Sequence, residues 1–252
     1  MSLLVADGVT KTFAGITALD DVCIDVAEGE MVGLIGPNGA GKTTFFNCLL
    51  GVLKPNGGRV TFAGRDLTRV PTHRRARMGI ARTFQRIELF SGMSPREHFL
   101  VAERVHNERG ALWKDLLFLG RPTAAEKARA QAMLDLLGLG PVADRKVESL
   151  SLGMGRLVEI GRALMISPKL VLLDEPSSGL DRGETAELAE SLRTVRREQG
   201  IAILLVEHDV DLVRELVERV FVLDFGTLIA SGTTSEVFAD SAVRKAYLGD
   251  MV

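Results

Sequence analysis

The sequence predicts an α/β protein in which a block of helices interrupts a parallel sheet. Two short apolar runs, residues 170–173 and 201–206, are typical of strands that are buried on both faces of a parallel sheet. A third strand, at residues 31–35, leads through a glycine-rich loop into a helix. We expect a single domain over residues 1–252, with a helical subdomain at approximately residues 87–166 inserted in the α/β core.

The N-terminal part of the chain is expected to be rich in strands. Residues 3–36 alternate β-rich stretches with turns. The first helix is expected over Lys42–Leu50, because Gly51 ends it. Residues 54–62 then contain a turn that enters a hairpin strand.

Capping boxes place three later helices, because a Ser, Thr or Asp followed three residues later by Glu marks a helix start. They lie at Ser94, Thr123 and Asp181, and the second helix is expected to run to Gly138. Towards the end of the chain we expect a short helix, a hairpin around Gly226 and a C-terminal helix.

Bulk composition excludes several classes of protein. Hydrophobic residues make up 46% and charged residues 25% of the chain, as in ordinary globular proteins and unlike disordered ones. The formal net charge of −2 provides no global basic field for nucleic acid. No apolar run reaches the ~18 residues of a spanning helix, and no signal peptide is expected at the N-terminus. Cys23 and Cys48 lack metal-ligand spacing, so we expect two buried free thiols.

A glycine-rich loop separates the strand at residues 31–35 from the first helix. It reads Gly-Pro-Asn-Gly-Ala-Gly-Lys-Thr and matches the Walker A pattern in the strand-to-helix context that this pattern requires. Glycines let backbone N–H groups turn inward around a phosphate chain, and the helix N-terminus adds its positive dipole end. The alternative is a simple glycine-rich turn. The expected phosphate-binding residues are Gly36, Pro37, Asn38, Gly39, Ala40, Gly41, Lys42, Thr43 and Thr44.

Two acids follow the apolar strand at residues 170–173. Asp174 and Glu175 stand at the carboxyl end of a strand, where open α/β sheets bind ligands. We expect Asp174, with the Thr43 hydroxyl, to hold Mg²⁺ and Glu175 to orient the attacking water. Phosphoryl transfer needs mainly such positioning and charge neutralisation. Taken alone, the two acids also fit a solvated acidic loop.

Together with four further stretches, these motifs resemble the ATPases of ABC transporters over nearly the whole chain. The stretches resemble the family's Q-loop, signature motif, D-loop and switch-histidine loop, and lie at residues 82–85, 150–154, 179–181 and 206–209. The resemblance implies a P-loop NTPase core with an N-terminal antiparallel β subdomain and an inserted α-helical subdomain. It also implies a head-to-tail dimer with two ATP molecules between the subunits.

The resemblance assigns roles to individual residues. Gln85 and His208 join Glu175 as catalytic residues, and Gln85 joins Thr43 and Asp174 as a ligand of Mg²⁺. The remaining assignments are Phe13, which stacks on adenine, Asp181 of the D-loop, and Ser151, Leu152, Gly153 and Met154 of the signature, which face the ATP of the opposite subunit.

The signature departs from the family pattern at two positions. Leu152 stands in place of a glycine and Met154 in place of a glutamine. Leucine restricts the backbone, and methionine cannot donate the hydrogen bond that glutamine offers. Ser151 and Gly153 remain, so we expect closure of the dimer to survive these changes.

Within the family, the chain resembles the importer subunits for branched-chain amino acids. Residues 80–85 and 89–90, the insert at residues 106–122 and the tail at residues 246–249 carry this resemblance. It implies a homodimer, or a heterodimer with a sister ATPase, beneath two integral-membrane permeases on the cytoplasmic side of the cell membrane. A substrate-binding protein supplies the amino acid. Residues 87–90 are then expected to line a groove for a permease helix.

Other tasks within the family remain alternatives. Related importers take urea or short amides, and the ATPase of a lipopolysaccharide exporter has a similar core and a similar Tyr-Leu-Gly tail. A non-transport ABC ATPase is disfavoured, because Lys42 and Asp174 lie only 132 positions apart with no coiled coil between them. No nucleic-acid partner is expected, since the basic stretch at residues 69–77 fits a solvated face.

Overall fold

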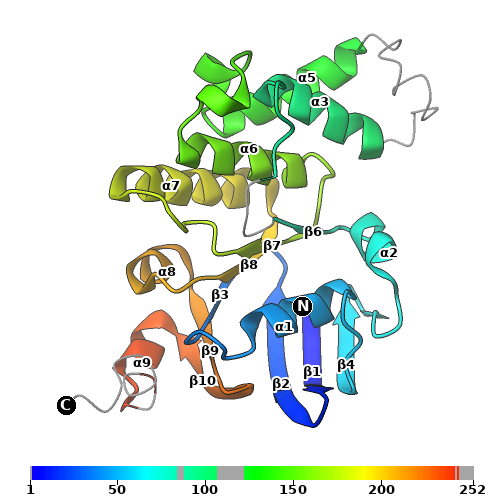
Figure 1. Ribbon diagram of the computed structural model, residues 1–252, viewed down its shortest axis with the longest axis vertical. Coiled ribbons are helices and arrows are strands. Elements are labelled where there is room, and N and C mark those ends of the chain that lie inside the picture. Colours follow the sequence, from blue (N-terminus) through cyan, green and yellow to red (C-terminus); the bar gives the residue numbers. More distant parts are fainter. Residues whose placement is uncertain (1, 84–87, 107–121, 242, 244–252) are drawn as a thin grey trace.

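A six-stranded sheet forms the centre of the computed structural model, which describes residues 2–83, 88–106, 122–241 and 243 (Figure 1). Its strand order is β10-β9-β3-β8-β7-β6, and only β10 is antiparallel to its neighbour. The strands are β3 (Met31–Ile35), β6 (Ile80–Arg82), β7 (Leu170–Asp174), β8 (Ala202–Val206), β9 (Arg219–Asp224) and β10 (Thr227–Thr233).

A second, four-stranded sheet is antiparallel and has the order β2-β1-β4-β5. Its strands are β1 (Ser2–Phe13), β2 (Ile16–Ala27), β4 (Gly57–Phe62) and β5 (Arg65–Asp66). This sheet and the parallel-strand core confirm the predicted fold class, an α/β core with an N-terminal antiparallel β part.

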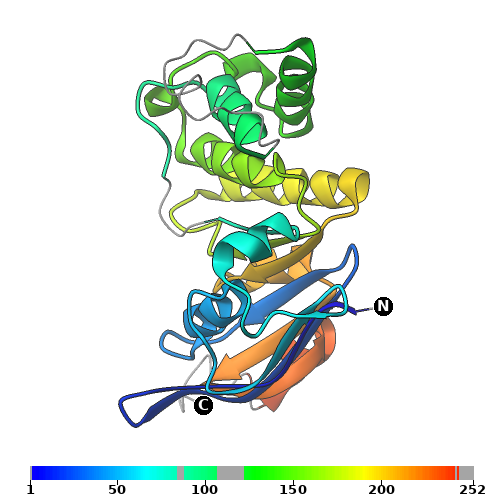
Figure 2. The same cartoon turned by 90° about the vertical axis from the view of Figure 1, so that its right-hand side faces the viewer.

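The described helices lie on both sides of the six-stranded sheet. They are α1 (Lys42–Leu50), α2 (Thr72–Arg77), α3 (Pro95–His106), α5 (Ala124–Leu136), α6 (Leu152–Leu164), α7 (Arg182–Gln199), α8 (Val210–Leu216) and α9 (Thr234–Ala239), with 3-10 turns at Gly140–Val142 and Val147–Ser149. Figures 1 and 2 agree that α3, α5, α6 and α7 lie on the side of the sheet away from the antiparallel sheet.

Alternate residues of the central strands enter two different hydrophobic cores, because side chains of a strand point to opposite faces. On β8, Ile203 and Leu205 enter the core shared with α5, α6, α7 and α8. Leu204 and Val206 enter the core shared with α1 and the antiparallel sheet. Burial on both faces explains why β7 and β8 are continuous apolar runs.

The predicted caps are confirmed where helices begin. Thr123 and Asp181 each accept a hydrogen bond from the backbone N–H three residues later, and a Glu at that position bonds back to the cap. Ser94 and Glu97 form the same reciprocal pair before α3. Each capping box satisfies first-turn donors that would otherwise lack partners.

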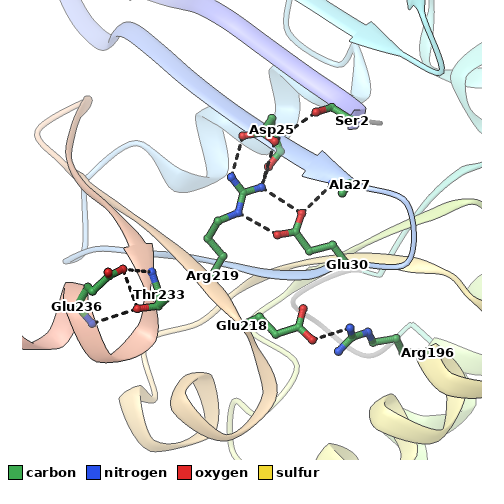
Figure 3. A network of polar contacts seen from close by, with 9 residues as sticks. All are labelled: Ser2, Asp25, Ala27, Glu30, Arg196, Glu218, Arg219, Thr233 and Glu236. Atoms are coloured by element: carbon green, nitrogen blue, oxygen red, sulfur yellow. Dashed lines mark hydrogen bonds and ion pairs between the residues drawn. The ribbon is translucent and has the colours of Figure 1, made fainter.

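Arg219, at the start of β9, joins the two sheets through carboxylates (Figure 3). Its guanidinium bonds both carboxylate oxygens of Asp25 on β2, at 2.9 and 3.1 Å, and both oxygens of Glu30 just before β3, at 2.9 and 3.1 Å. These hydrogen bonds hold the pKa of Asp25 below its usual range. Nearby, Arg196 of α7 forms an ion pair with Glu218.

The two cysteines differ in their exposure. Cys48 is buried, as predicted, but Cys23 is exposed, because its place in the alternation of β2 points away from the core.

The predicted C-terminal helix at the end of the chain lies outside the described residues. Within the described ranges, no helix has both the length and the apolar character needed to span a membrane.

Candidate functional site

Three strand ends bring the predicted motifs to one edge of the central sheet. β8 lies between β3 and β7. In register, Leu34 stands opposite Val206, and Val206 stands opposite Asp174. The loops that follow these parallel strands therefore leave the sheet side by side, as expected for a ligand site in an α/β sheet.

At two of its glycines, the loop after β3 leaves no room for a side chain. A Cβ at Gly36 would lie 2.1 Å from the carbonyl oxygen of Leu223 at the end of β9, and a Cβ at Gly41 would lie 2.7 Å from that of Ala18. Gly41 has φ 104° and is the N-cap of α1, so it offers no side-chain acceptor to the first-turn N–H groups. Such a helix start suits an anion.

Lys42, the first residue of α1, folds back over the same loop. Its ammonium donates to the carbonyl oxygens of Gly36 at 2.5 Å and Pro37 at 3.0 Å, and the residue is buried. Burial lowers the pKa of Lys42, while the neighbouring Glu175 and Asp174 carboxylates oppose that shift. The structure therefore places the loop lysine within the field of both acids from the end of β7.

Asp174 is buried and paired with a cation. The guanidinium of Arg82, on β6, contacts an Asp174 carboxylate oxygen at 2.9 Å and donates to the side-chain oxygen of Asn47, on α1, at 3.1 Å. Arg82 thus connects β6, β7 and α1 around the site. Its part was not foreseen from the sequence.

Glu175 adopts a backbone conformation that is rare for a residue with a side chain. Its φ is 48°, in the left-handed region, and its N–H donates to the carbonyl oxygen of Val206 at 2.9 Å. Residues in this region persist only where their surroundings support them, often at functional sites. The chain turns sharply out of the sheet at this acid.

The loop after β8 contains a second buried acid that the sequence did not single out. Glu207 is fully buried, whereas the neighbouring His208 side chain is exposed. Glu207 accepts hydrogen bonds from the backbone N–H and the hydroxyl of Ser177, at 2.9 and 2.7 Å, and from the His208 backbone N–H at 3.1 Å. Glu207 therefore connects the loop after β7 with the loop after β8 through hydrogen bonds.

The sequence profile of the family described as "ABC transporter" matches residues 19–178, which contain the Walker A loop, the signature and the acidic strand end. The chain belongs to the ABC transporter family. It is the ATP-binding and ATP-hydrolysing subunit of such a transporter. A second profile, described as "Branched-chain amino acid ATP-binding cassette transporter", matches residues 227–252.

Curated relatives match over almost the full length. The high-affinity branched-chain amino acid transport ATP-binding protein LivG of Salmonella typhimurium is 40% identical and covers 98% of each chain. The lipopolysaccharide export system ATP-binding protein LptB of Acidithiobacillus ferridurans is 36% identical and covers 98% of this chain and 97% of its own.

Solved structures of ABC cassettes share the fold. An ATP-binding cassette of an ABC transporter in its ADP conformation has a TM-score of 0.87 at 33% identity, covering 99% of this chain and 100% of that chain. A dimeric ATP-binding cassette in a post-hydrolysis state, bound to ADP and phosphate, has a TM-score of 0.76 at 26% identity, covering 92% of this chain and 98% of that chain.

The residues predicted to form the signature, at 150–154, lie at the start of α6. Ser151 is the N-cap, and its hydroxyl accepts from the Met154 N–H at 3.3 Å. The Gly153 N–H donates to a carboxylate oxygen of Glu184, on α7, at 3.0 Å. This bond and one from the Ser151 hydroxyl hold the pKa of Glu184 below its usual range.

Leu152 and Met154, which depart from the signature pattern, each have a defined position in the structure. Leu152 is the first residue of α6, so its backbone is helical and needs none of the freedom of glycine. Its side chain packs close to Gly179, where a Cβ would lie 3.1 Å from a Leu152 methyl group. Met154 packs partly buried against the core beneath α6.

The remaining predicted residues lie on other elements or outside the described residues. Phe13, at the tip of the β1–β2 hairpin, is 42% exposed and has the Lys11 ammonium 5.0 Å from its ring centre. Asp181 is the N-cap of α7. Gln85 falls outside the described residues, as does Ile87 of the predicted permease groove.

Proposed function

We propose that this chain drives an importer for branched-chain or other hydrophobic amino acids. The LivG relative, at 40% identity, is named for branched-chain amino acid transport, and so is the profile that matches residues 227–252. The lipopolysaccharide export relative is slightly less similar, at 36%. The experiment that tests the proposal therefore measures cargo directly.

The observation that supports the reaction chemistry is the meeting of the Walker A loop, Asp174, Glu175 and the His208 loop at one edge of the sheet. The glycine-rich loop and the start of α1 bind the phosphates of ATP, with Lys42 at the β- and γ-phosphates. Phe13 stacks on the adenine.

Mg²⁺ fits the oxygen donors that the site offers. The Thr43 hydroxyl and the Asp174 carboxylate are hard oxygen ligands, and Gln85 is proposed as a third. Among the described residues, no group of three or more His, Cys, Asp or Glu side chains is placed to hold a metal ion. That sparse donor set suits an ion that keeps waters and binds substrate phosphates. When bound, the ion neutralises charge on the phosphate oxygens.

Glu175 orients and polarises the water that attacks the γ-phosphate. The water oxygen forms a bond to phosphorus, the bond between phosphorus and the β–γ bridging oxygen breaks, and ADP and phosphate are the products. Lys42 stabilises the charge that accumulates on the departing ADP, and His208 contacts the γ-phosphate and the Glu175 region.

The chain acts as a head-to-tail dimer with itself or with a sister ATPase. Each ATP lies between the Walker A loop of one subunit and Ser151, Leu152, Gly153 and Met154 of the other. One solved relative is a dimeric cassette, which supports this arrangement. The dimer lies on the cytoplasmic side of the cell membrane, beneath two permeases, and a substrate-binding protein supplies the cargo.

Leu89 and Phe90 are proposed to contact a permease helix. Leu89 packs on the core, while Phe90 is 56% exposed and has the Arg162 guanidinium 5.6 Å from its ring centre. The ring also stacks on His98, with the two ring centres 5.7 Å apart. An exposed ring that packs against Arg162 and His98 suits a helix-in-groove contact.

Uptake of labelled leucine, isoleucine and valine tests the proposal in cells that lack the chromosomal copy of this chain. Wild-type protein is expected to restore uptake, and the Glu175→Gln variant, which keeps the size of the side chain, is not. Urea and acetamide serve as competing cargoes. Restored urea uptake, or rescue of an outer-membrane lipopolysaccharide defect without amino-acid uptake, would overturn the cargo assignment.

A further inference from the structure

Glu207 combines complete burial with a set of hydrogen bonds that point to a functional role. A buried carboxylate is costly unless it is fully hydrogen-bonded, and an apolar residue of similar volume often gives equal or better stability. Glu207 nevertheless lies directly after β8, where its two oxygens bond different loops. One oxygen accepts from Ser177, and the other accepts from the His208 N–H and lies 3.8 Å from His208 Nδ1.

Both loops carry residues of the proposed reaction. Ser177 lies two positions after Glu175, whose left-handed backbone needs support from its surroundings. Bonds to a carboxylate are shorter and stronger than neutral ones, so they fix the Ser177 peptide firmly. The same carboxylate fixes the backbone of His208.

We propose that Glu207 is a positioning residue that holds the Glu175 carboxylate and the His208 imidazole in one geometry for hydrolysis. The inference rests on the proposed roles of these two residues. Because Glu207 is fully buried, it acts through its neighbours rather than on ATP.

The Glu207→Gln variant tests this inference with little change in volume. A glutamine amide accepts on one side only, so the bond to either Ser177 or His208 is lost. We expect kcat for ATP hydrolysis to fall about tenfold or more, because small misplacements of reacting groups have large effects. The Kd of a fluorescent ATP analogue is expected to stay within about twofold, because the Walker A loop is untouched.

The Ser177→Ala variant removes one donor and leaves the carboxylate in place. It is expected to lower kcat in the same direction, and the double variant is expected to be no slower than Glu207→Gln alone, since the contacts act as one unit. Glu198→Gln, on the exposed end of α7, is the control and keeps wild-type rates.

Wild-type kcat in Glu207→Gln would overturn the inference. So would a loss of ATP affinity or of melting temperature that accounts for the lower rate, because that result indicates a purely structural role. A wild-type chain without ATP hydrolysis, alone or with its partners, would instead contradict the proposed function.

A second, independent observation concerns Glu184. One carboxylate oxygen accepts from the Gly153 N–H at 3.0 Å, and the other accepts from the Asp181 N–H at 3.3 Å. The contact is close, since a Cβ at Gly153 would lie 2.9 Å from the Glu184 Cβ. The Gly153 donor assigned to the partner's ATP is thus occupied by a carboxylate of the same chain.

We infer that Glu184 takes the place of the partner's γ-phosphate in the separate subunit and that closure of the dimer displaces it. This inference rests on the proposed head-to-tail dimer. The Gly153 N–H cannot serve both anions at full strength. Because Glu184 also forms the capping box with Asp181, its displacement couples the signature to the D-loop.

Sedimentation in the Glu175→Gln background measures the ATP concentration that half-converts the chain to dimer. Adding Glu184→Gln, which preserves a capping box, is expected to lower that concentration about threefold or more, since a neutral acceptor binds the donors about half as strongly. Glu187→Gln makes the same charge change one turn away on an exposed site and is expected to have no effect.

Equal ATP dependence in the Glu184→Gln and Glu187→Gln variants would overturn this second inference. A parent that does not dimerise at any ATP concentration, even with a sister ATPase present, would contradict the dimer itself. Hydrogen exchange at the Gly153 amide without nucleotide provides a second readout, and is expected to be faster in Glu184→Gln than in the parent.

Discussion

At the scale of single residues, Glu175 and Met154 are expected to differ sharply in their effect on hydrolysis. Glu175 is proposed to polarise water, a role that contributes about 10²–10⁴-fold in enzymes. Met154 packs against the core beneath α6. We expect Glu175→Gln to lower steady-state ATP hydrolysis about a hundredfold or more and Met154→Gln by much less. An equal or greater loss in Met154→Gln would contradict this ranking.

The sequence locates those site residues whose pattern is contained in one short segment. The Walker A loop needs glycines, a lysine and a threonine in order, and its strand and helix are recognisable beside it. Glu207 has no such local pattern, because its partner Ser177 lies 30 positions away. Arg82 likewise meets Asp174 across 92 positions, through pairing of β6 with β7.

At the scale of elements, a buried arginine fixes the C-terminal end of α1. The Arg75 guanidinium donates to four carbonyl oxygens, those of Cys48 and Leu49 in α1 and of Leu67 and Val70 in the loop before α2. The last carbonyls of a helix have no partners within it. Arg75 donates to two of them and so helps to fix the position of α1, whose other end begins at the phosphate loop.

Arg75→Ala is therefore expected to destabilise the fold strongly. The Leu49 and Val70 carbonyls lose the Arg75 donor, while those of Cys48 and Leu67 keep the N–H groups of Gly51 and Val70. Loss of these buried charge-assisted hydrogen bonds costs about 3 kcal/mol, which for a chain of this size lowers Tm by roughly 6–12 °C. Arg74→Ala, at the exposed neighbouring position of α2, is the matched control and is expected to shift Tm little. Calorimetry of the two variants measures the difference, and similar Tm values would show that water replaces the guanidinium.

The junction of the two sheets is expected to weaken in acid. Arg219 holds the pKa of Asp25 below its ordinary value of 3.8, so the contact contributes stability above that pH. The contribution disappears as the pH falls through the lowered pKa. Urea unfolding of wild type and Arg219→Gln is expected to give a constant difference from about pH 7 to about pH 5, and a shrinking one below about pH 4.

Asp25→Asn provides the control for this acid effect. It removes the titrating carboxylate while the bonds of Arg219 to Glu30 remain. Comparison of Asp25→Asn with an Asp25→Asn/Arg219→Gln double variant is expected to show a smaller change in the acid range, since only the Glu30 contact remains. A wild-type difference that stays constant down to about pH 3 would assign the effect to other groups.

Element boundaries followed from local signals, whereas the arrangement of elements did not. Capping boxes and apolar runs predicted most helices and strands correctly, because caps and burial act on neighbouring residues. Sheet order and the contact of α3 with α6 depend on distant residues. A Cβ at Gly161 would lie 2.4 Å from the ring of Phe99, so this close approach depends on a glycine with no turn or cap to mark it.

At the scale of the whole molecule, the fold separates the two halves of the proposed ATP site. The Walker A loop and the acids lie at the edge of the central sheet, whereas Ser151 and Gly153 begin α6 in the helical part. Both parts share the core that contains β7, β8, α6 and α7. A site composed of one half from each of two subunits, as proposed, is therefore expected to transmit closure directly into the sheet.

Mixing two inactive variants tests that composite site. Lys42→Ala damages the phosphate loop, and Gly153→Asp places a charge where the opposite γ-phosphate is proposed to bind. A mixed head-to-tail dimer contains one site with both defects and one intact site, so an equal mixture is expected to recover about a quarter of wild-type hydrolysis. The matched mixture of Lys42→Ala with Glu175→Gln places one defect in every site and is expected to recover nothing. Recovery in the second mixture would contradict the assignment of Lys42 and Glu175 to the same half-site. No recovery in either, with mixed dimers present, would contradict a site shared between two copies of this chain.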